Sequence, residues 1–149
     1  MKIIVDSNII FSALLKYTGS IGDILFNSEE LFTFSAPLFL HKEIEDHWNK
    51  LKKISKLGEE ELRQSQFRIY QRVKFHDEKL IPHRIWLSSE SLVKEIDEDD
   101  VAFVALARHL RGMLWSGDRV LVNGLRKTGY KKVITTQELM DIRKETMRG

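Results

Sequence analysis

The sequence contains no cysteine and only two prolines among its 149 residues. The lack of cysteine excludes disulfide bonds and thiolate metal sites, and it permits a reducing compartment. No apolar run approaches the roughly 20 residues needed to cross a bilayer. The N-terminus enters an apolar stretch at once, without the basic start and small-residue cleavage site of a signal peptide. We therefore expect a cytoplasmic protein that has no membrane partner.

An excess of charge of one sign is also lacking, because 24 Lys and Arg residues nearly balance 22 Asp and Glu residues. The resulting net charge of +2 says little about partners, and a nucleic-acid binder would have to concentrate its positive charge locally. The apolar content of 42% and the charged content of 31% are typical of a globular chain. A single domain over residues 1–149, with one core, is the simplest expectation.

Strand patterns alternate with helix patterns along the whole chain, with no internal repeat or interdomain linker. Short strands are predicted over residues 2–5, 31–35, 73–75, 113–116 and 132–135. Helices are predicted over residues 9–15, 20–26, 37–53, 59–70, 84–96, 101–111, 119–127 and 136–144. This alternation favours an α/β fold in which a short parallel sheet is covered by helices on both faces.

Asp6 ends the apolar run Ile3-Ile4-Val5, which has the pattern of a strand buried on both faces. Ser7 and Asn8, which follow it, are residue types that start helices. A carboxylate at the carboxyl end of a central strand lies where open α/β sheets bind ligands. The alternative is a loop aspartate that only caps the next helix, and these residues alone leave both interpretations open.

Asp100 heads the clearest predicted helix and lies on its inward side. At about 100° per residue, Asp100 falls within the stripe formed by Phe103, Val104 and Ala107. The acidic run from Asp97 to Asp100 also suits the positive end of the helix dipole. In the alternative interpretation, Asp97 or Asp99 caps the helix and Asp100 only favours the dipole. The inward direction favours a functional role for Asp100.

Glu43 lies beside the buried face of the helix predicted over residues 37–53, whose first turn accommodates Pro37. That face is marked by Leu40, Ile44, His47 and Leu51. Glu45 lies on the other flank of the same stripe, so helical periodicity does not choose between Glu43 and Glu45.

Asp118 follows the strand over residues 113–116, much as Asp6 follows the strand over residues 2–5. Two adjacent parallel strands that end in acids would place both carboxylates on one rim of the sheet. A Ser-Gly-Asp turn is also common at any strand-to-helix junction. Several carboxylates at one point need a cation to offset their repulsion, and Mg²⁺ and Mn²⁺ prefer oxygen ligands.

Other kinds of catalytic site find no support in the sequence. The five histidines show no spacing suited to a zinc site with a third ligand in reach, and no serine lies in a Gly-x-Ser-x-Gly elbow. A glycine-rich phosphate loop is absent. Asp6 is not followed by the Asp-x-Asp-x-Thr pattern that a doubly wound phosphatase would use.

The motifs together resemble those of the PIN-domain ribonucleases, a family that includes the toxin halves of many prokaryotic toxin–antitoxin pairs. Val5-Asp6-Ser7-Asn8 is similar to its first motif, an apolar strand followed by Asp, Ser or Thr, and Asn. Residues 99–107 resemble its central motif, in which the acid at Asp100 heads a small-residue-rich helix. Residues 114–119 resemble its last motif, with Asp118 as the acid. Glu43 falls where the family places its glutamate.

This resemblance implies a three-layer α/β/α sandwich of the PIN type and a metal-dependent endoribonuclease that hydrolyses RNA. The implied ligands of Mg²⁺ or Mn²⁺, and the implied catalytic residues, are Asp6, Glu43, Asp100 and Asp118. The implied supporting residues are Asn8 and Ser116, with Asp97 and Asp99 as secondary candidates. An antitoxin protein is the implied partner. The alternative is a PIN-fold module that binds RNA or regulates without catalysis.

Basic residues follow Asp118 closely and are candidates for RNA binding, namely Arg119, Arg126 and Lys127, with Lys131 and Lys132 beyond them. They could bring a phosphate backbone to an acidic crevice, although a solvated helix face explains each of them equally well. The polar segment over residues 51–85 is expected to form an extra helical arm. Its apolar positions Leu62, Ile69 and Val73 leave it open to a partner, and we expect a homodimer.

Overall fold

A parallel sheet of five strands lies at the centre of the molecule, within the residues that the computed structural model describes, 1–16 and 18–148. The strands are β1 (Lys2–Val5), β2 (Thr33–Pro37), β3 (Val73–His76), β4 (Met113–Trp115) and β5 (Val133–Ile134). They lie in the order β3-β2-β1-β4-β5, so the predicted parallel sheet is confirmed.

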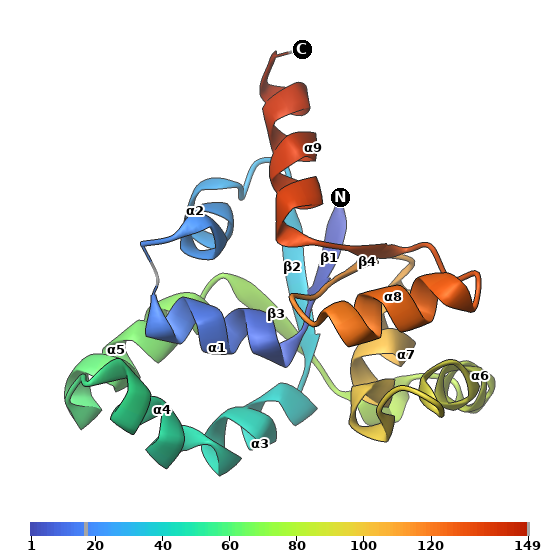
Figure 1. Ribbon diagram of the computed structural model, residues 1–149, viewed down its shortest axis with the longest axis horizontal. Coiled ribbons are helices and arrows are strands. Elements are labelled where there is room, and N and C mark those ends of the chain that lie inside the picture. The colour runs from blue at the N-terminus through green and yellow to red at the C-terminus, as the bar shows by residue number, and fades with distance from the viewer. Residues whose placement is uncertain (17, 149) are drawn as a thin grey trace.

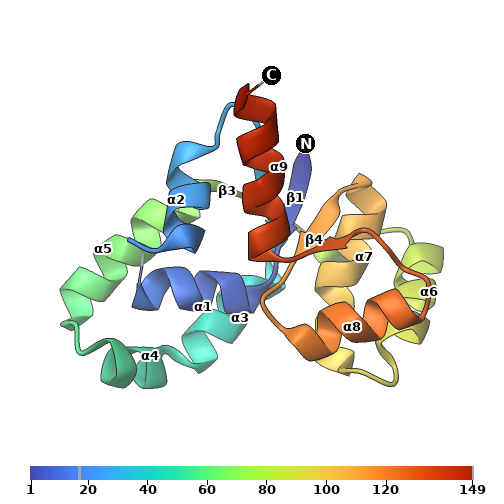
Figure 2. The same cartoon turned by 45° about the horizontal axis from the view of Figure 1, so that its top comes forward.

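Helices cover both faces of this sheet, as Figures 1 and 2 show. One side carries α1 (Ser7–Leu15), α2 (Ser20–Asn27), α3 (Phe39–Asp46), α4 (Trp48–Ser55) and α5 (Glu59–Tyr70). The other side carries α6 (His83–Val93), α7 (Val101–Leu110) and α8 (Arg119–Lys127), while α9 (Thr136–Arg148) returns against α2. Two 3₁₀ helices, η1 (Glu78–Leu80) and η2 (Glu98–Asp100), precede α6 and α7. The predicted three-layer α/β/α sandwich is confirmed.

The strand order reverses between β1 and β4. From β1 the chain moves outward through β2 to β3, and it then returns to β4 on the opposite side of β1. In open α/β sheets, the crevice outside the carboxyl ends of two such strands is where ligands bind. Val5 pairs in register with Trp115, so Asp6 and Ser116 leave the two strands at the same level.

The central strand β1 is enclosed on both faces, which explains its continuous apolar sequence. Ile3, Ile4 and Val5 are each 0% exposed. Gly112, just before β4, permits the close approach of the two strands. A Cβ atom at Gly112 would lie 2.5 Å from Cδ1 of Ile4 and 2.8 Å from the carbonyl oxygen of Lys2. Any side chain there would push β4 away from β1 and would separate the two loops that carry Asp6 and Asp118.

The prediction of one long helix over residues 37–53 is wrong. Pro37 ends β2, and α3 begins at Phe39 after the N–H of Leu38 has donated to the carbonyl oxygen of His76 at 2.9 Å. The helix breaks at His47, whose side chain is exposed although the periodicity places it on the buried face. The break allows the larger apolar side chain of Trp48 to take the buried position, where it is 6% exposed.

The polar segment over residues 51–85, expected to form an extra helical arm, contains the end of α4, all of α5, β3 and η1, and the start of α6. Helix α5 packs against α1, and the side chains of Leu62, Ile69 and Val73 belong to the hydrophobic core. These positions are therefore filled by the chain's own fold, and they give no support to the expected homodimer.

Within residues 1–16 and 18–148, no single helix is long and apolar enough to cross a membrane. The bent pair formed by α1 and α2 meets the same test only when the two helices are counted together, by length and composition.

Candidate functional site

Asp6 is the most deeply buried acid of the crevice, and its carboxylate is held by hydrogen bonds from both strand ends. Its side chain is 2% exposed. Oδ1 accepts from the backbone N–H of Ser7 at 2.8 Å. Oδ2 accepts from Nδ2 of Asn8 at 2.9 Å and from the hydroxyl of Ser116 at 2.7 Å. Asp6 therefore caps α1, as one interpretation expects, and it also faces the loop after β4, as the other expects.

Asn8 and Ser116 tie together the two loops that border the crevice. Nδ2 of Asn8 donates to the Ser116 hydroxyl at 3.3 Å, and Oδ1 of Asn8 accepts from the N–H of Gly117 at 2.9 Å. The Ser116 hydroxyl also accepts from the N–H of Asp118 at 3.0 Å. Asn8 and Ser116, the supporting residues that the resemblance implies, thus fix the loop of Asp118 against the loop of Asp6.

Asp118 caps α8 and lies at the exposed rim of the crevice. Its Oδ1 accepts from the N–H groups of Val120 at 3.0 Å and Leu121 at 3.3 Å. Because one oxygen takes both cap bonds, Oδ2 is left outside the cap. A capping role and a role in the crevice are therefore compatible in this residue.

The cap makes a prediction about stability that is separate from catalysis. Asp118→Ala should lower the free energy of unfolding by about 1 kcal/mol, because alanine cannot accept the two N–H groups. Asp118→Asn should leave it nearly unchanged, because asparagine caps helices as well as aspartate does. Urea denaturation of the two variants measures the difference. Both variants remove the same negative charge, but only alanine removes the cap. An equal loss of unfolding free energy in both would therefore show that the cap contributes nothing.

Glu43 and Asp100 each bring a buried oxygen that has no hydrogen-bond partner among residues 1–16 and 18–148, Oε1 of Glu43 and Oδ2 of Asp100. Unpartnered buried carboxylate oxygens are rare, because the desolvation of such a group is costly. Glu45, the alternative to Glu43, is exposed and forms an ion pair with Arg63. The structure thus separates two glutamates that helical periodicity could not distinguish.

The acidic run before α7 contains one cap residue and one inward-facing acid. Oδ1 of Asp97 accepts from the N–H of Asp99 at 3.0 Å and so caps η2. Asp99 is exposed. Asp100 is partly buried just before α7, and its side chain makes no cap bond to that helix. Asp97 thus has the capping role that the alternative interpretation gives it, whereas Asp100 makes no cap bond.

Burial and mutual repulsion raise the pKa values of three of these carboxyl groups. Burial raises the pKa of Asp6 to about 6 against the effect of the hydrogen bonds that it accepts. Burial and the charge of Asp6 raise the pKa of Glu43 to about 7. Burial raises the pKa of Asp100 to about 8, with further increases from Asp6, Asp97, Asp118 and Glu43. Asp6 and Asp100 therefore lie within electrostatic range of each other and of Asp118, and Glu43 lies within range of Asp6 and Asp100.

The donor set fits a hard divalent cation in its chemistry. Every candidate ligand is a carboxylate oxygen, the donor type that Mg²⁺ and Mn²⁺ prefer, and two of the oxygens are buried without another partner. In the described ranges, 1–16 and 18–148, no three acidic or histidine side chains are already arranged so that they could hold a metal ion. Binding a cation would therefore require the carboxylate groups to move closer together.

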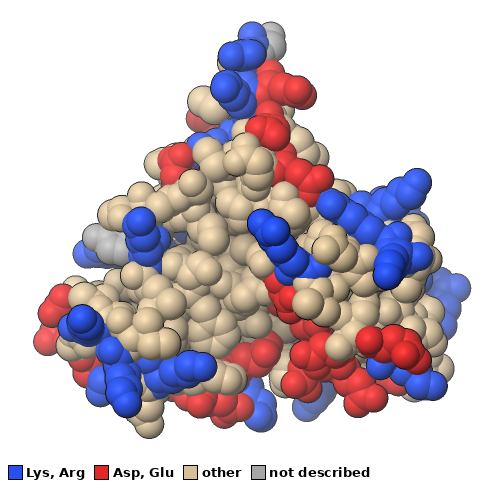
Figure 3. Space-filling view, viewed as in Figure 1, with Lys and Arg blue, Asp and Glu red and all other residues tan. Residues whose placement is uncertain are grey.

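The predicted RNA-binding residues do not all lie beside the acids. Arg119 is next to Asp118 at the start of α8, whereas Arg126 and Lys127 lie at its far end, about 12 Å along the helix. Nη2 of Arg126 donates to Glu138 at 2.7 Å and to the carbonyl oxygen of Val133 at 3.2 Å, which ties α8 to β5 and α9. Figure 3 shows acidic side chains gathered between α3 and α8, and basic ones gathered beyond α8.

Two residues that position α3 have no signal in the local sequence. The N–H of Phe39 donates to Oε1 of Glu78 at 2.7 Å, across 39 residues of sequence. Arg63 pairs with Glu45 across 18 residues. Contacts of this range are set by the tertiary fold, and a helical or strand period cannot reveal them.

Comparisons with known proteins bear on the family and the fold of the chain. The family model of the PIN domain matches residues 4–143 of the chain. Among solved structures, the chain is similar to one from the crystal structure of VapBC2 from Rickettsia felis bound to a DNA fragment from their promoter. The TM-score is 0.67 and the identity 14%, and the match covers 91% of this chain and 97% of that one. A search of curated proteins finds no match.

Proposed function

The chain belongs to the PIN domain family, and from this membership we propose that it is a metal-dependent endoribonuclease that hydrolyses phosphodiester bonds in RNA. One observation carries the proposal. Among the described residues, Glu43 and Asp100 each have a buried carboxylate oxygen without a hydrogen-bond partner, and each lies close enough to Asp6 for its charge to raise their pKa values. A purely structural crevice would satisfy such atoms with hydrogen bonds, whereas a cation site needs them free.

The roles of the residues follow from their surroundings. Asp6, Glu43, Asp100 and Asp118 would hold Mg²⁺ or Mn²⁺. Bound there, the ion would lower the pKa of a water for attack on phosphorus and would offset the charge that develops on the phosphate. Asn8 and Ser116 keep the Asp6 carboxylate oriented toward the crevice through the hydrogen bonds that they donate. The Ser116 hydroxyl is engaged in this network, donating to Asp6 and accepting from the N–H of Asp118, and water is the proposed attacking group.

Single-stranded RNA incubated with the purified protein tests the proposal directly. We expect cleavage in Mg²⁺ or Mn²⁺, none in EDTA, and none by Asp6→Asn or Asp100→Asn. Asp100→Asn is the cleaner variant, because the Asp6 carboxylate accepts three hydrogen bonds and an amide cannot accept all of them. Equal activity of both variants and the wild type would refute the proposal. RNA binding that survives without cleavage would favour the non-catalytic module instead.

We also propose an antitoxin protein as partner and a cytoplasmic location. The support is the likeness of the three sequence motifs to a family that includes toxins of toxin–antitoxin pairs. The structural similarity to a chain of VapBC2 agrees with this proposal. Expression of the chain in bacteria should arrest growth if it is a toxin, and expression of Asp100→Asn should not.

A further inference from the structure

Helix α3, which carries Glu43, has few means of fixing its own position. It contains only eight residues, fewer than an isolated helix needs for stability in water. Its N-cap residue is Leu38, which provides no side-chain cap, and its first turn contains no acid. The position of Glu43 therefore depends on contacts that other parts of the chain make with α3.

The segment between α4 and α6 supplies such contacts at both ends of the helix. At the start of α3, Oε1 of Glu78 in η1 accepts from the N–H of Phe39 at 2.7 Å. In its last turn, Glu45 is held by Arg63 of α5. Nη1 and Nη2 of Arg63 donate to the two carboxylate oxygens of Glu45, the second at 3.1 Å, so the pair has the forked geometry that fixes orientation.

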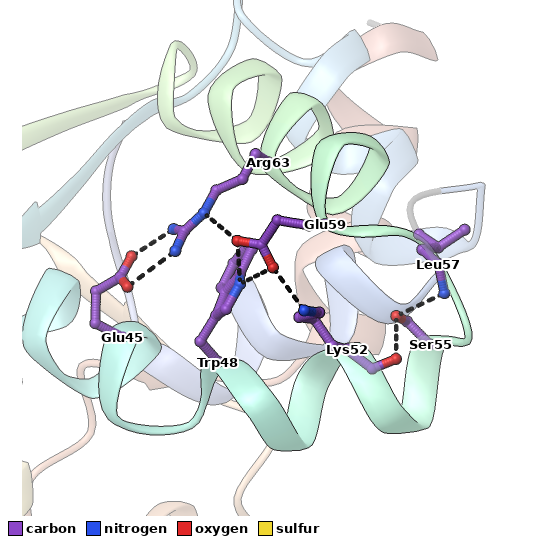
Figure 4. Close-up of polar contacts among 7 residues, drawn as sticks. All are labelled: Glu45, Trp48, Lys52, Ser55, Leu57, Glu59 and Arg63. Carbon is purple, nitrogen blue, oxygen red and sulfur yellow. Dashed lines mark hydrogen bonds and ion pairs between the residues drawn. The ribbon is translucent and has the colours of Figure 1, made fainter.

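Arg63 is itself held in place by a network that Figure 4 shows. Its guanidinium carbon lies 3.6 Å from the ring centroid of Trp48, at the start of α4. Nε of Arg63 donates to Glu59 at 3.3 Å, and Glu59 accepts from Nε1 of Trp48 at 3.0 Å and pairs with Lys52 at 2.9 Å. The guanidinium thus meets α3, α4 and α5 at one point, beside a buried tryptophan.

Glu45 and Glu43 are two residues apart and so point to opposite sides of α3. The pair with Arg63 acts on one side, and the crevice of acids lies on the other. The pair with Arg63 fixes the rotation of the last turn of α3, and it thereby fixes the direction in which the Glu43 side chain leaves the helix.

We propose that Arg63 is a positioning residue for Glu43, acting through Glu45 and Trp48 to hold α3 in the orientation that presents Glu43 to the crevice. The role of Glu43 as a metal ligand rests on the proposed function. The effect of Arg63 on the orientation of α3 does not. In this proposal, the segment over residues 59–80 helps to position a residue of the chain's own site.

Mn²⁺ binding to the full-length chain, measured by the electron paramagnetic resonance of the free ion, tests the inference without any cleavage assay. Arg63→Met should weaken Mn²⁺ binding about tenfold, the lower end of the range for residues that orient metal ligands. Glu45→Gln, which removes the other partner, should have a similar effect. In a Glu43→Gln background, Arg63→Met should change the affinity by less than about twofold, because its effect passes through Glu43.

Arg72→Met is a matched control. Arg72 pairs with Glu29 at 2.7 Å and lies over the ring of Phe26, and its exposed fraction of 36% is close to the 39% of Arg63. It lies on the arm of the fold away from the acids, so Mn²⁺ affinity should stay within about twofold of the wild type. Circular dichroism confirms that each variant is folded at the temperature of the measurement.

Amide hydrogen exchange over residues 39–46 provides a readout that needs no metal. Exchange should be faster in Arg63→Met and unchanged in Arg72→Met. The inference would be overturned if hydrogen exchange over residues 39–46 were unchanged in Arg63→Met, or if folded Arg63→Met bound Mn²⁺ as tightly as the wild type. It would also be overturned if Arg63→Met lost the same affinity in the wild-type and Glu43→Gln backgrounds. Faster exchange in a chain whose wild type binds no Mn²⁺ would overturn the proposed function and leave the effect of Arg63 on α3 standing.

Discussion

Asp100→Asn is expected to abolish RNA cleavage and to raise the melting temperature of the metal-free protein. Asparagine has nearly the same shape as aspartate but no charge, so it removes a metal ligand without opening a cavity. The loss of a ligand that supports several kcal/mol of transition-state stabilisation should lower the cleavage rate about 1000-fold or more. The same change removes a carboxylate that burial and four neighbouring acids make unfavourable in its charged form.

The gain in stability should depend on pH in a defined direction. The pKa of Asp100 is raised to about 8 in the folded chain, whereas the ordinary pKa of an aspartate is 3.8. Such a group destabilises the fold once the pH exceeds the unfolded value, and the cost grows until the pH passes the folded value. The melting temperature of Asp100→Asn should equal that of the wild type near pH 4 and exceed it by about 10–20 °C at pH 8.

Scanning calorimetry in EDTA at several pH values measures this difference. Asp46→Asn, an exposed acid of α3 that pairs with Lys42, is the control and should give no such rise. The comparison between variants is needed because Asp23, Glu45, Glu59 and Glu138 have lowered pKa values and stabilise the fold as the pH rises. A lower melting temperature for Asp100→Asn would contradict the account of its burial, and wild-type cleavage would contradict its catalytic role.

The acids that follow strands or head a helix could be located from the sequence because local patterns determine them. Asp6 and Asp118 each end an apolar strand, and the parallel sheet brings those ends together. Asp100 faces inward because the helical period of the residues after it places it on the buried stripe. The topology that joins these three positions follows from the alternation of strands and helices.

Glu43 shows where this reasoning stops. Helical periodicity placed Glu43 and Glu45 on two flanks of one stripe, and it extended the helix past a break at His47. The break depends on the burial of Trp48 beneath Arg63, and the choice of glutamate depends on the pair between Arg63 and Glu45. Both are contacts with α5, which no local pattern describes. For the same reason the sequence could not show which basic residues after Asp118 are available to bind RNA. Arg126, for example, forms an ion pair with Glu138.

Mn²⁺ is expected to stabilise the wild-type protein strongly at pH 8 and hardly at all at pH 5.5. The pKa values of Asp6, Glu43 and Asp100 are raised to about 6, 7 and 8, so at pH 5.5 these groups bind protons that a cation must displace. At pH 8 most of those protons have already left, and the repulsion among the carboxylates is at its largest. The ion then both finds its ligands free and removes the repulsion.

The size of the effect follows from the affinity for the folded chain. At a free Mn²⁺ concentration of about 100 times the dissociation constant, the stabilisation is about 2.7 kcal/mol, or about 5–10 °C in melting temperature for a chain of this length. Calorimetry with Mn²⁺ and with EDTA at both pH values measures it. Titration of Mn²⁺ in two buffers of different ionisation enthalpy should show protons released on binding at pH 6.5.

The Asp100→Asn variant separates binding in the crevice from binding elsewhere on the surface. It should lose most of the Mn²⁺-dependent rise at pH 8, because it lacks one ligand and has less repulsion for the ion to remove. A rise that is the same at pH 5.5 and pH 8, or that survives in Asp100→Asn, would place the ion on carboxylates with ordinary pKa values, outside the crevice. The buried, unpartnered oxygens of Glu43 and Asp100 would then need an explanation other than metal binding.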